Sequence, residues 1–253
     1  MKTEKLVYDG LQRCPYLEGR IARMPLYRQL RPLSLAEADR RFENEERRVG
    51  SCLYRTSCPT CTECRGIRVL VDAFRPSKSQ RRVRNRWKAK DFRIEYGPAS
   101  WSEQKLTLFN KHKQQRGLAE SADGEMSALG YVSWLVQSCF HTMEMRYFLG
   151  DRLVGVGIVD IGRQGMSSVY FYFDPADEIA ALSPGVFSVL QEIELCRRTG
   201  RQYLYLGLFV DACGHLNYKA NYLPHERMED GHWARYPEQP LQGESGAVAP
   251  VGK

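Results

Sequence analysis

The sequence contains no apolar run that approaches the ~20 residues a membrane-spanning helix needs. Its first residues, Met1 to Lys5, lack the apolar core of a signal peptide, so we expect a cytoplasmic protein. The sequence also has no P-loop, no dinucleotide-binding fingerprint and no Ser/His/Asp triad order. These absences argue against chemistry that uses a nucleoside triphosphate, a nicotinamide or a serine-bound intermediate.

Histidine is scarce, and none of the five histidines lies near the densest group of cysteines. In a cytoplasmic protein, cysteines are expected to be reduced thiols, metal ligands or redox centres rather than a disulfide framework. Cys58, Cys61 and Cys64 recur at every third position, so their sulfurs can point at one centre. Cys14 is the candidate fourth ligand of a zinc site, with Cys52 as its rival. The alternative is a loop of thiols that bind no metal.

Positive charge is abundant and concentrated. The net charge is +7, the pI is about 9.0, and nine basic residues face a single acid, Asp91, between positions 75 and 93. Such a run is typical of a surface that contacts nucleic-acid phosphates, although a solvated helix face is the alternative. The basic residues are Arg75, Lys78, Arg81, Arg82, Arg84, Arg86, Lys88, Lys90 and Arg93.

The distribution of turn residues predicts two domains. Gly97-Pro98 marks a boundary between a smaller cysteine- and arginine-rich domain over residues 1–98 and a second domain over residues 99–238. A disordered tail is expected over residues 239–253. Hydrophobic periodicity and capping residues predict the elements. We expect helices over 35–48, 77–90, 102–116 and 131–138 and between Ser183 and Gly200, and strands over 68–74, 145–149, 153–161, 168–173 and 202–210.

The predicted elements describe a mixed fold of the α/β (α+β) class. In the second half, three strands, a well-capped helix and a further strand suit an N-acetyltransferase-like domain. The glycine-rich turn that would wrap a coenzyme A pyrophosphate is missing there. An acetyl-CoA-dependent enzyme is therefore a disfavoured reading.

Several long motifs follow one another in one order along the chain. They are Cys14-Pro-Tyr-Leu, Arg47-Arg48, Tyr54-Arg55, Arg68, Phe74-Arg-Pro-Ser-Lys-Ser-Gln-Arg-Arg, Val159-Asp160, Ser167-Ser-Val-Tyr-Phe-Tyr-Phe-Asp-Pro, Tyr203-Leu-Tyr-Leu-Gly and Asn217-Tyr-Lys. In these motifs the sequence resembles the bacterial leucyl/arginyl-tRNA–protein transferases of the N-degron pathway, the aspartate/glutamate leucyltransferases among them. The resemblance covers roughly residues 14–236. The sequence departs from the family pattern at Glu46, Val49, Leu208-Phe209 and His215-Leu216.

The resemblance implies transfer of an aminoacyl group from tRNA to the N-terminal amine of a protein that starts with Asp or Glu, which marks that protein for degradation. Leucine is the preferred transferred residue, and arginine is the alternative. A non-catalytic protein that binds tRNA or N-degrons is the alternative of another class. The donor ester is already activated, so no cofactor is required. The resemblance to eukaryotic members adds an iron–sulfur cluster to zinc as a possible occupant of Cys14, Cys58, Cys61 and Cys64.

The resemblance also implies catalytic residues near the C-terminus. Tyr218, Lys219 and Tyr222 are expected at the reacting end, where Lys219 holds an oxyanion or ribose phosphate and Tyr218 or a bound water relays a proton. We expect the basic helix and the Tyr218–Lys219 segment to share a groove. The alternative is that the two tyrosines are core aromatics.

Polar residues on the predicted strands are further candidates. Ser168, Tyr170 and Tyr172 share one face by alternation and are expected to bind substrate, with Asp160 as a catalytic neighbour. The alternative is a solvent-exposed sheet face.

Arginines suit the two anionic substrates. A bidentate arginine would recognise an acidic N-terminal residue, and Arg47, Arg48, Arg55 and Arg68 are the candidates. The basic helix offers Arg81, Arg82 and Arg86 for phosphate and Gln80 for ribose or base. Solvated side chains are the alternative for some of these arginines.

Overall fold

A computed structural model describes residues 3–115 and 124–237. The expected tail over 239–253 and the last residue of the helix expected over 102–116 lie outside the described residues. A mixed eight-stranded sheet with the order β14-β13-β7-β12-β11-β10-β9-β8 dominates the molecule. Its strands are β7 (Arg65–Leu70), β8 (Phe92–Pro98), β9 (His141–Leu149), β10 (Arg152–Ile161), β11 (Gly165–Phe173), β12 (Tyr203–Phe209), β13 (His225–Glu229) and β14 (His232–Tyr236).

The middle of this sheet follows the predicted order. β9, β10 and β11 form an antiparallel meander, with Gly150 at a positive φ of 54° in the predicted turn. Helix α6 (Pro184–Arg198) then crosses to β12, which runs parallel to β11. Pro184 begins the helix as predicted, but Ser183 adopts a left-handed conformation and makes no capping hydrogen bond. Gly200, at φ 70°, follows the helix end as expected.

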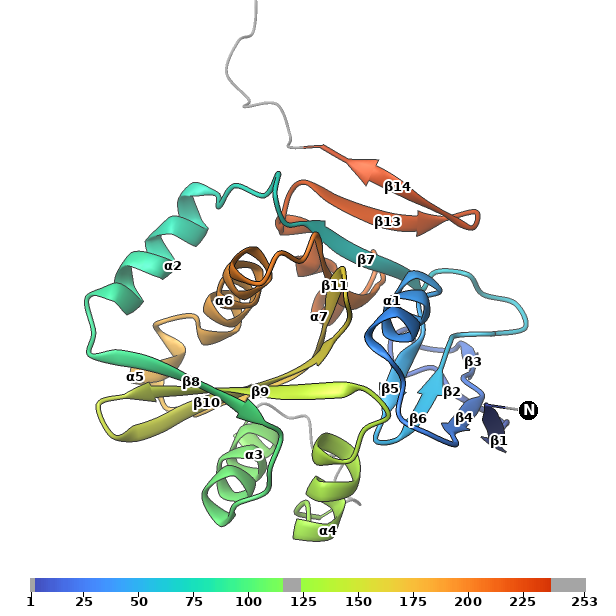
Figure 1. Cartoon of the computed structure of the whole chain (residues 1–253), viewed down its shortest axis with the longest axis horizontal. Helices are drawn as coiled ribbons and strands as arrows, with labels where there is room; N and C mark the ends of the chain where they lie inside the picture. The colour runs from blue at the N-terminus through green and yellow to red at the C-terminus, as the bar shows by residue number, and fades with distance from the viewer. Residues whose placement is uncertain (1–2, 116–123, 238–253) are drawn as a thin grey trace, which may run out of the picture.

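Helices cover both faces of the sheet (Figure 1). On one face, α6 and α2 (Lys78–Lys88) pack against the largest core cluster, where Trp87 stacks on Phe187 at 4.4 Å between ring centroids. On the other face, α3 (Glu103–Gln115), α4 (Ala128–Tyr131) and the π-helical turn η1 (Val132–Val136) enclose a second cluster. The short helix α5 (Asp177–Ala180) precedes α6. Among the described residues, no helix is long and apolar enough to cross a membrane.

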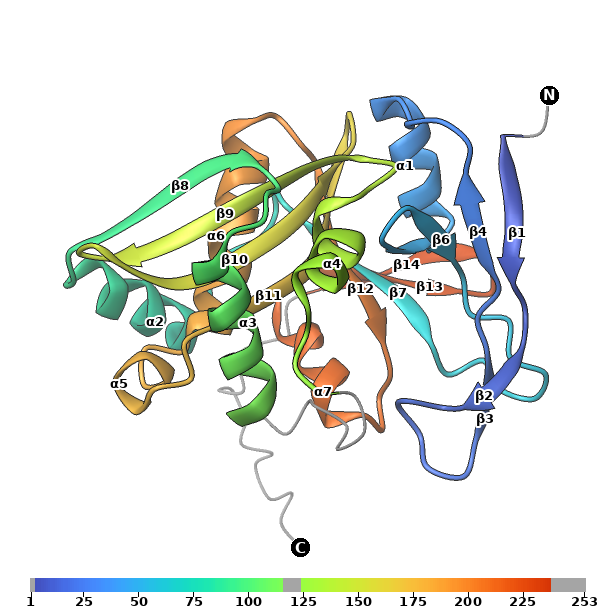
Figure 2. The same cartoon turned by 90° about the horizontal axis from the view of Figure 1, so that it is seen from below.

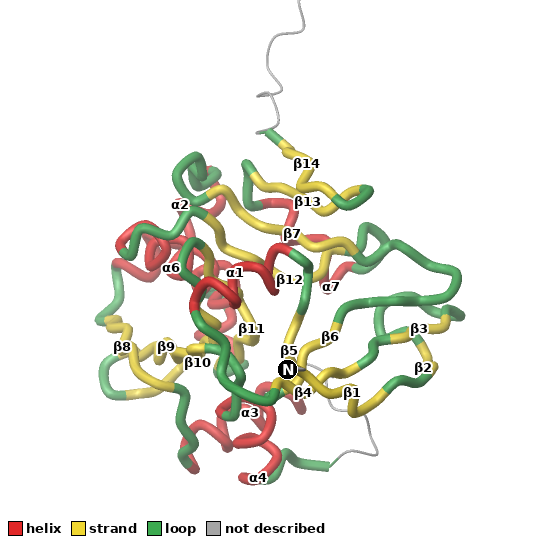
Figure 3. Tube along the Cα trace, turned by 45° about the vertical axis from the view of Figure 1, so that its right-hand side comes forward, coloured by secondary structure: helices red, strands yellow, loops and turns green. Residues whose placement is uncertain are grey.

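The N-terminal strands form a separate four-stranded sheet and a two-stranded hairpin beside β7 (Figures 2 and 3). Ser34 caps helix α1 (Leu35–Glu43) through a capping box with Glu37. The expectation that this helix reaches residue 48 is wrong, because Glu45 takes a positive φ and residues 47–49 pair with the next strand. These strands are β1 (Glu4–Tyr8), β2 (Leu11–Arg13), β3 (Ile21–Arg23), β4 (Leu26–Gln29), β5 (Arg47–Val49) and β6 (Cys52–Tyr54).

The predicted fold class, a mixed α/β arrangement with a large sheet and a smaller N-terminal part, is confirmed. The first 98 residues also supply β7, α2 and β8 to the large sheet and its cover. β7 lies between β12 and β13, so a strand from the first half of the chain completes the large sheet between two strands from the second half. The boundary at residue 98 stays a prediction.

Candidate active site

A cleft opens where two parallel strands separate. β11 and β12 pair only from Gly165 to Ser167, and an irregular register with β10 follows at Ser168. Beyond that point α6, the short helix α7 (Gly214–Asn217) and the 3-10 turn η2 (Tyr218–Asn221) border a cavity of about 740 Å³. A bulge of this kind re-aims side chains, here toward the opening.

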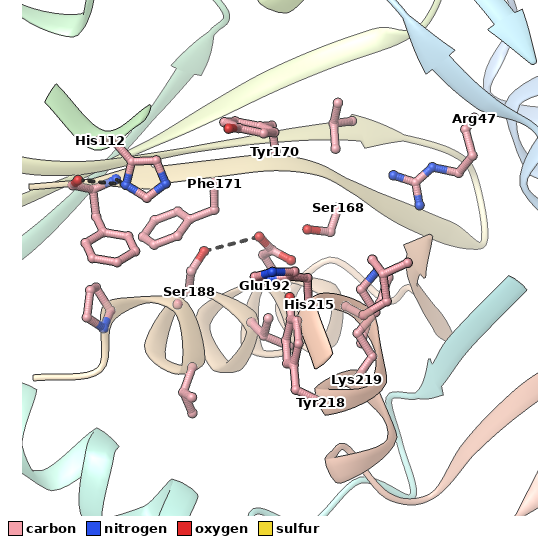
Figure 4. Close-up of a pocket in the computed structure, with 18 of the residues that line it drawn as sticks. Arg47, His112, Ser168, Tyr170, Phe171, Ser188, Glu192, His215, Tyr218 and Lys219 are labelled. Atoms are coloured by element: carbon pink, nitrogen blue, oxygen red, sulfur yellow. Dashed lines mark hydrogen bonds between the residues drawn. The ribbon is translucent and has the colours of Figure 1, made fainter. Parts of the chain in front are cut away.

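The centre of the cleft holds a buried acid, Glu192 of α6 (Figure 4). Glu192 is only 1% exposed, and Ser188 Oγ donates to Glu192 Oε1 at 3.3 Å. By hydrogen-bond geometry, Oε2 has no partner among the described residues. Burial raises the pKa of Glu192 to about 7, against a smaller opposing effect of the Ser168 and Ser188 hydroxyls.

One end of the cleft is cationic. Arg47 of β5 reaches in next to Gly207, whose φ is 85°, and a Cβ there would lie 1.1 Å from Arg47 Nη1. Glycine is therefore required for Arg47 to occupy this place. Lys219 Nζ donates to the Leu208 carbonyl at 2.6 Å, and burial together with Arg47 lowers the pKa of Lys219 to about 7. Tyr16 and Tyr54 line the same cleft.

The remainder of the lining is largely apolar. Phe171 and Phe173 of β11 face α6, which contributes Val186 and Val189. The cleft thus combines a cationic corner, a central carboxyl and an apolar surface in one cavity.

A second cavity, of about 1390 Å³, adjoins the first. One wall is α2, with Ser79, Arg82 and Arg86, and the opposite wall includes the 218–223 segment. Ser183, Val186 and Tyr218 line both cavities. Of the Tyr218–Lys219 segment, Tyr218 therefore shares a groove with the basic helix, as expected, whereas Lys219 lines the adjoining main cleft.

Six predicted residues line the main cleft: Arg47, Arg48, Ser168, Tyr170, Tyr218 and Lys219. Tyr222 instead lines the second cavity with its ring inside the core, tilted against Phe74 at 6.4 Å, and its hydroxyl is buried without a hydrogen-bond partner among the described residues. Tyr222 is therefore a core aromatic at the groove floor, and it does not line the main cleft with Lys219.

The structure places several other candidates away from the cleft. Asp160 is 1% exposed and accepts from Arg48 Nε at 2.7 Å and from Thr142 Oγ1 at 2.5 Å. Arg48 lines the cleft, but its guanidinium is taken up by Asp160 and by the carbonyls of Trp134 and Leu135. This buried pair joins β5 to β10 and η1, which is a structural task.

Tyr172 and Arg68 are also structural. The Tyr172 hydroxyl lies 2.6 Å from that of Tyr131 in the second core, because the register irregularity turns Tyr172 to the face opposite the cleft. Arg68 Nε donates to Glu226 at 2.6 Å and its guanidinium lies over the Tyr203 ring. The expectation that these two side chains bind substrate in the cleft does not match their positions.

The candidates on α2 divide into two groups. Gln80 accepts from the Ser77 amide and donates to the Asn221 carbonyl at 3.0 Å, so its amide holds α2 against η2 instead of facing a ribose. Arg86 lines the groove and donates to the Ala181 carbonyl and to Ser183 Oγ. Arg82 lines the groove and is exposed, whereas Arg81 is exposed outside it and donates to Pro76.

The four candidate metal ligands are neighbours without being a ligand set. Burial and the nearby thiols of Cys14, Cys58 and Cys61 raise the pKa of Cys64 to about 12. Among the described residues, no three His, Cys, Asp or Glu side chains are arranged to hold a metal ion. No step of the chemistry is therefore assigned to zinc or to an iron–sulfur cluster, and metal binding stays a prediction.

Sequence reasoning missed Glu192 and gave no role to His215, which also lines the cleft. A signal for Glu192 was present, since it is the one acid at a buried position of α6, four residues after Ser188. Positions four apart share a helix face, so a Ser/Glu pair inside an apolar stripe indicates a polar cavity.

Two family models match the chain and agree in their description. They are "Arginine-tRNA-protein transferase, N terminus" over residues 12–82 and "Arginine-tRNA-protein transferase, C terminus" over residues 104–229. They describe enzymes that transfer an aminoacyl group from tRNA to protein. The chain belongs to the arginine-tRNA-protein transferase family and is an aminoacyl-tRNA–protein transferase.

Curated relatives carry a more specific activity in their names. The aspartate/glutamate leucyltransferase of Aeromonas salmonicida is 31% identical over 246 residues, which are 95% of this chain and 100% of that protein. Its counterpart in Aeromonas hydrophila is 34% identical over 197 residues, covering 77% and 79% of the two chains. Leucine is the residue that the sequence analysis preferred.

Solved structures are more distant. The C-terminal domain of a putative lysylphosphatidylglycerol synthetase from Agrobacterium fabrum is 11% identical with a TM-score of 0.47, and covers 68% of this chain and 58% of that one. L-PGS from Bacillus licheniformis is 12% identical with a TM-score of 0.42, covering 58% and 45%. At this level of similarity neither structure bears on the activity.

Proposed function

We propose that this protein transfers leucine from Leu-tRNA to the N-terminal α-amine of proteins that begin with Asp or Glu, in the cytoplasm, and thereby marks them for degradation. The observation that carries the proposal is that Arg47, without a salt-bridge partner among the described residues, lies in one cleft with Lys219 and Glu192. The names of the relatives supply the donor and the acceptor.

The donor would enter along the groove beside α2. Arg82 and Arg86 line this groove and suit the phosphates of the tRNA 3′ end. Tyr218, Ser183 and Val186 line both cavities, so the two cavities are continuous. A tRNA 3′ end bound in the groove would therefore place its esterified residue in the main cleft. Phe171, Phe173 and Val189 offer an apolar surface to a leucine side chain.

The acceptor would place its acidic side chain at the cationic end. Of the arginines predicted for this purpose, Arg48 is bound to Asp160 and Arg68 to Glu226. Arg47 remains available in the cleft, and its planar guanidinium can hold a carboxylate through two parallel hydrogen bonds. Lys219 is the candidate to stabilise the developing oxyanion.

The chemistry asks little beyond orientation. An aminoacyl ester is already activated, and an α-amine with a pKa of about 7.7–8.0 is partly neutral at pH 7. Holding the amine against the ester carbonyl removes most of the entropic barrier. The proposal therefore includes no cofactor requirement.

One assay tests donor, acceptor and turnover together. Labelled Leu-tRNA and labelled Arg-tRNA are each incubated with the protein and with peptides that begin with Asp, Glu or Ala. We expect label from Leu-tRNA on the Asp and Glu peptides and little on the Ala peptide. Transfer from Arg-tRNA alone would replace leucine by arginine, and no transfer from either donor would contradict the proposal.

A further inference from the structure

Glu192 is a buried carboxyl with an unused oxygen at the centre of the cleft. Ser188 Oγ donates to Oε1, while Oε2 lacks a hydrogen-bond partner among the described residues. Leaving a buried polar atom unpaired is energetically costly, so native structures keep few such atoms. Because Oε2 is an acceptor without a donor and lines the cleft, we expect a hydrogen-bond donor of the substrate to occupy this position.

The groups around Glu192 come from every neighbouring element. None of them forms a salt bridge with its carboxylate among the described residues. The Arg47 and Lys219 cations lie at the cationic end of the cleft, where Lys219 donates to Leu208, and Arg48 is paired with Asp160. The facing titratable, polar and charged groups are Ser168 and Tyr147 from the sheet, Ser188 and Cys196 from α6, and His215, Tyr218, Lys219, Tyr222 and Arg47 from the remaining walls.

We propose that Glu192 binds the α-ammonium group of the acceptor protein and removes the proton that blocks its attack on the aminoacyl ester. This assignment rests on the proposed function, because it needs an amine acceptor and an ester donor in the same cleft. It makes Glu192 a catalytic residue and explains why α6 carries a carboxyl at a buried position.

The protons and bonds balance in three steps. The ammonium gives one proton to Glu192 Oε2, which leaves a neutral amine. The amine nitrogen forms a bond to the ester carbonyl carbon, the carbon–oxygen bond to the tRNA ribose breaks, and the second nitrogen proton passes to the leaving ribose oxygen. Glu192 then releases its proton to water, so the products are an amide, uncharged tRNA and one proton.

Lys219 is the rival proton acceptor, since burial brings the pKa of its ammonium to about 7 as well. Its surroundings argue against that role. Lys219 Nζ is engaged with the Leu208 carbonyl and lies near the Arg47 guanidinium, so this corner repels an ammonium and attracts carboxylates. An acceptor that begins with Asp or Glu carries both charges and fits the cleft in one orientation, with its ammonium toward Glu192.

The test is a pH profile of single-turnover transfer with saturating Leu-tRNA and an Asp-initiated peptide. In the wild-type protein the rate should rise with a midpoint near pH 7, the value to which burial raises the pKa of Glu192. In Glu192→Gln the rate at pH 7 should fall by roughly 100-fold or more. The remaining rate should rise only near pH ~8, where the α-amine itself becomes neutral.

Matched variants separate a chemical role from a structural one. Glu194→Gln changes an exposed acid two residues further along α6 and should match the wild-type protein in rate and midpoint. Glu192→Asp keeps the carboxyl and should restore part of the rate with its midpoint below that of the amine. Thermal unfolding and Leu-tRNA affinity, measured for each variant, check that Glu192→Gln still folds and still binds its donor.

Three results would overturn the assignment: an unchanged rate and midpoint in Glu192→Gln, a loss explained entirely by weaker Leu-tRNA binding, or a midpoint that persists in Glu192→Gln and disappears in Lys219→Met. Failure of the proposed function would give a different result. If the wild-type protein transferred from Arg-tRNA and not from Leu-tRNA, the leucine assignment would be contradicted. The pH profile measured with Arg-tRNA would still test Glu192, because the acceptor ammonium is unchanged.

Discussion

At the scale of single residues, charge pairing separates arginines that look alike in the sequence. Arg47 and Arg48 are adjacent, and strand alternation sends their side chains to opposite faces of β5. Arg48 meets Asp160 in the interior, whereas Arg47 reaches the cleft beside Gly207. Only the partners supplied by distant strands distinguish a structural arginine from one that is available to a substrate.

Replacing Arg47 by Lys should weaken the preference for acidic acceptors. The charge remains, but the pair of parallel hydrogen bonds to a carboxylate is lost. We expect kcat/KM for Asp- and Glu-initiated peptides to fall by roughly 10- to 100-fold, as for loss of a charged hydrogen bond, with little change for an Ala-initiated peptide. Steady-state transfer assays measure kcat/KM for each of the three peptides.

Arg55→Lys is the matched control, because Arg55 is exposed outside the cleft and was an equal candidate by sequence. It should leave all three peptides unaffected. If Arg47→Lys reduced transfer to the Ala peptide as strongly as to the Asp peptide, Arg47 would have no part in reading the acidic side chain.

At the scale of elements, α2 both packs against α6 and presents basic residues to the groove. Ser77 and Gln80 form a capping box that begins the helix, and Val83 and Trp87 bury one stripe against α6. The structure confirms the predicted helix, and local signals alone were sufficient to predict it. Which of its basic residues face the groove depended on the packing of that stripe, since the helix could be placed only once its apolar face had a partner.

Arg82→Gln should weaken tRNA binding by removing one phosphate contact. The dependence of log K on log salt should become shallower by about 0.7–0.9, and the loss of affinity should shrink at high salt. Filter binding or anisotropy across a salt series measures the slope. Arg81→Gln is the control, because Arg81 is equally exposed but lies outside the groove, and an equal change in slope for Arg81 would place the RNA elsewhere.

At the scale of the whole molecule, the small N-terminal sheet and the large sheet are joined by buried charges and by a shared cluster. Arg48 and Asp160 have side chains that are each 2% exposed. Phe42 of α1 stacks on Phe140 and packs at a tilt against Tyr205. Because Arg47 enters the cleft from the strand that holds Arg48, this joint positions the cationic corner.

Asp160→Ala should destabilise the fold by about 3–5 kcal/mol, since it leaves the Arg48 charge buried without its partner. Urea unfolding of the variant and the wild-type protein measures the difference. Asp151→Asn, in the exposed turn between β9 and β10, should change the free energy of unfolding by less than about 0.5 kcal/mol. A loss below about 1 kcal/mol for Asp160→Ala would show that the joint does not depend on this pair.

The sequence by itself determined the elements with strong local signals: the meander around Gly150, the α6 crossover, the capped helices and the basic character of α2. Its motifs also determined the family. Tertiary structure alone decided the cleft, because β11 and β12 separate after Ser167 and bring α6, η2 and β5 around one space. Local propensity acts over a few residues, whereas burial, which pairs Arg48 with Asp160 and raises the pKa of Glu192, arises only when distant segments exclude water together.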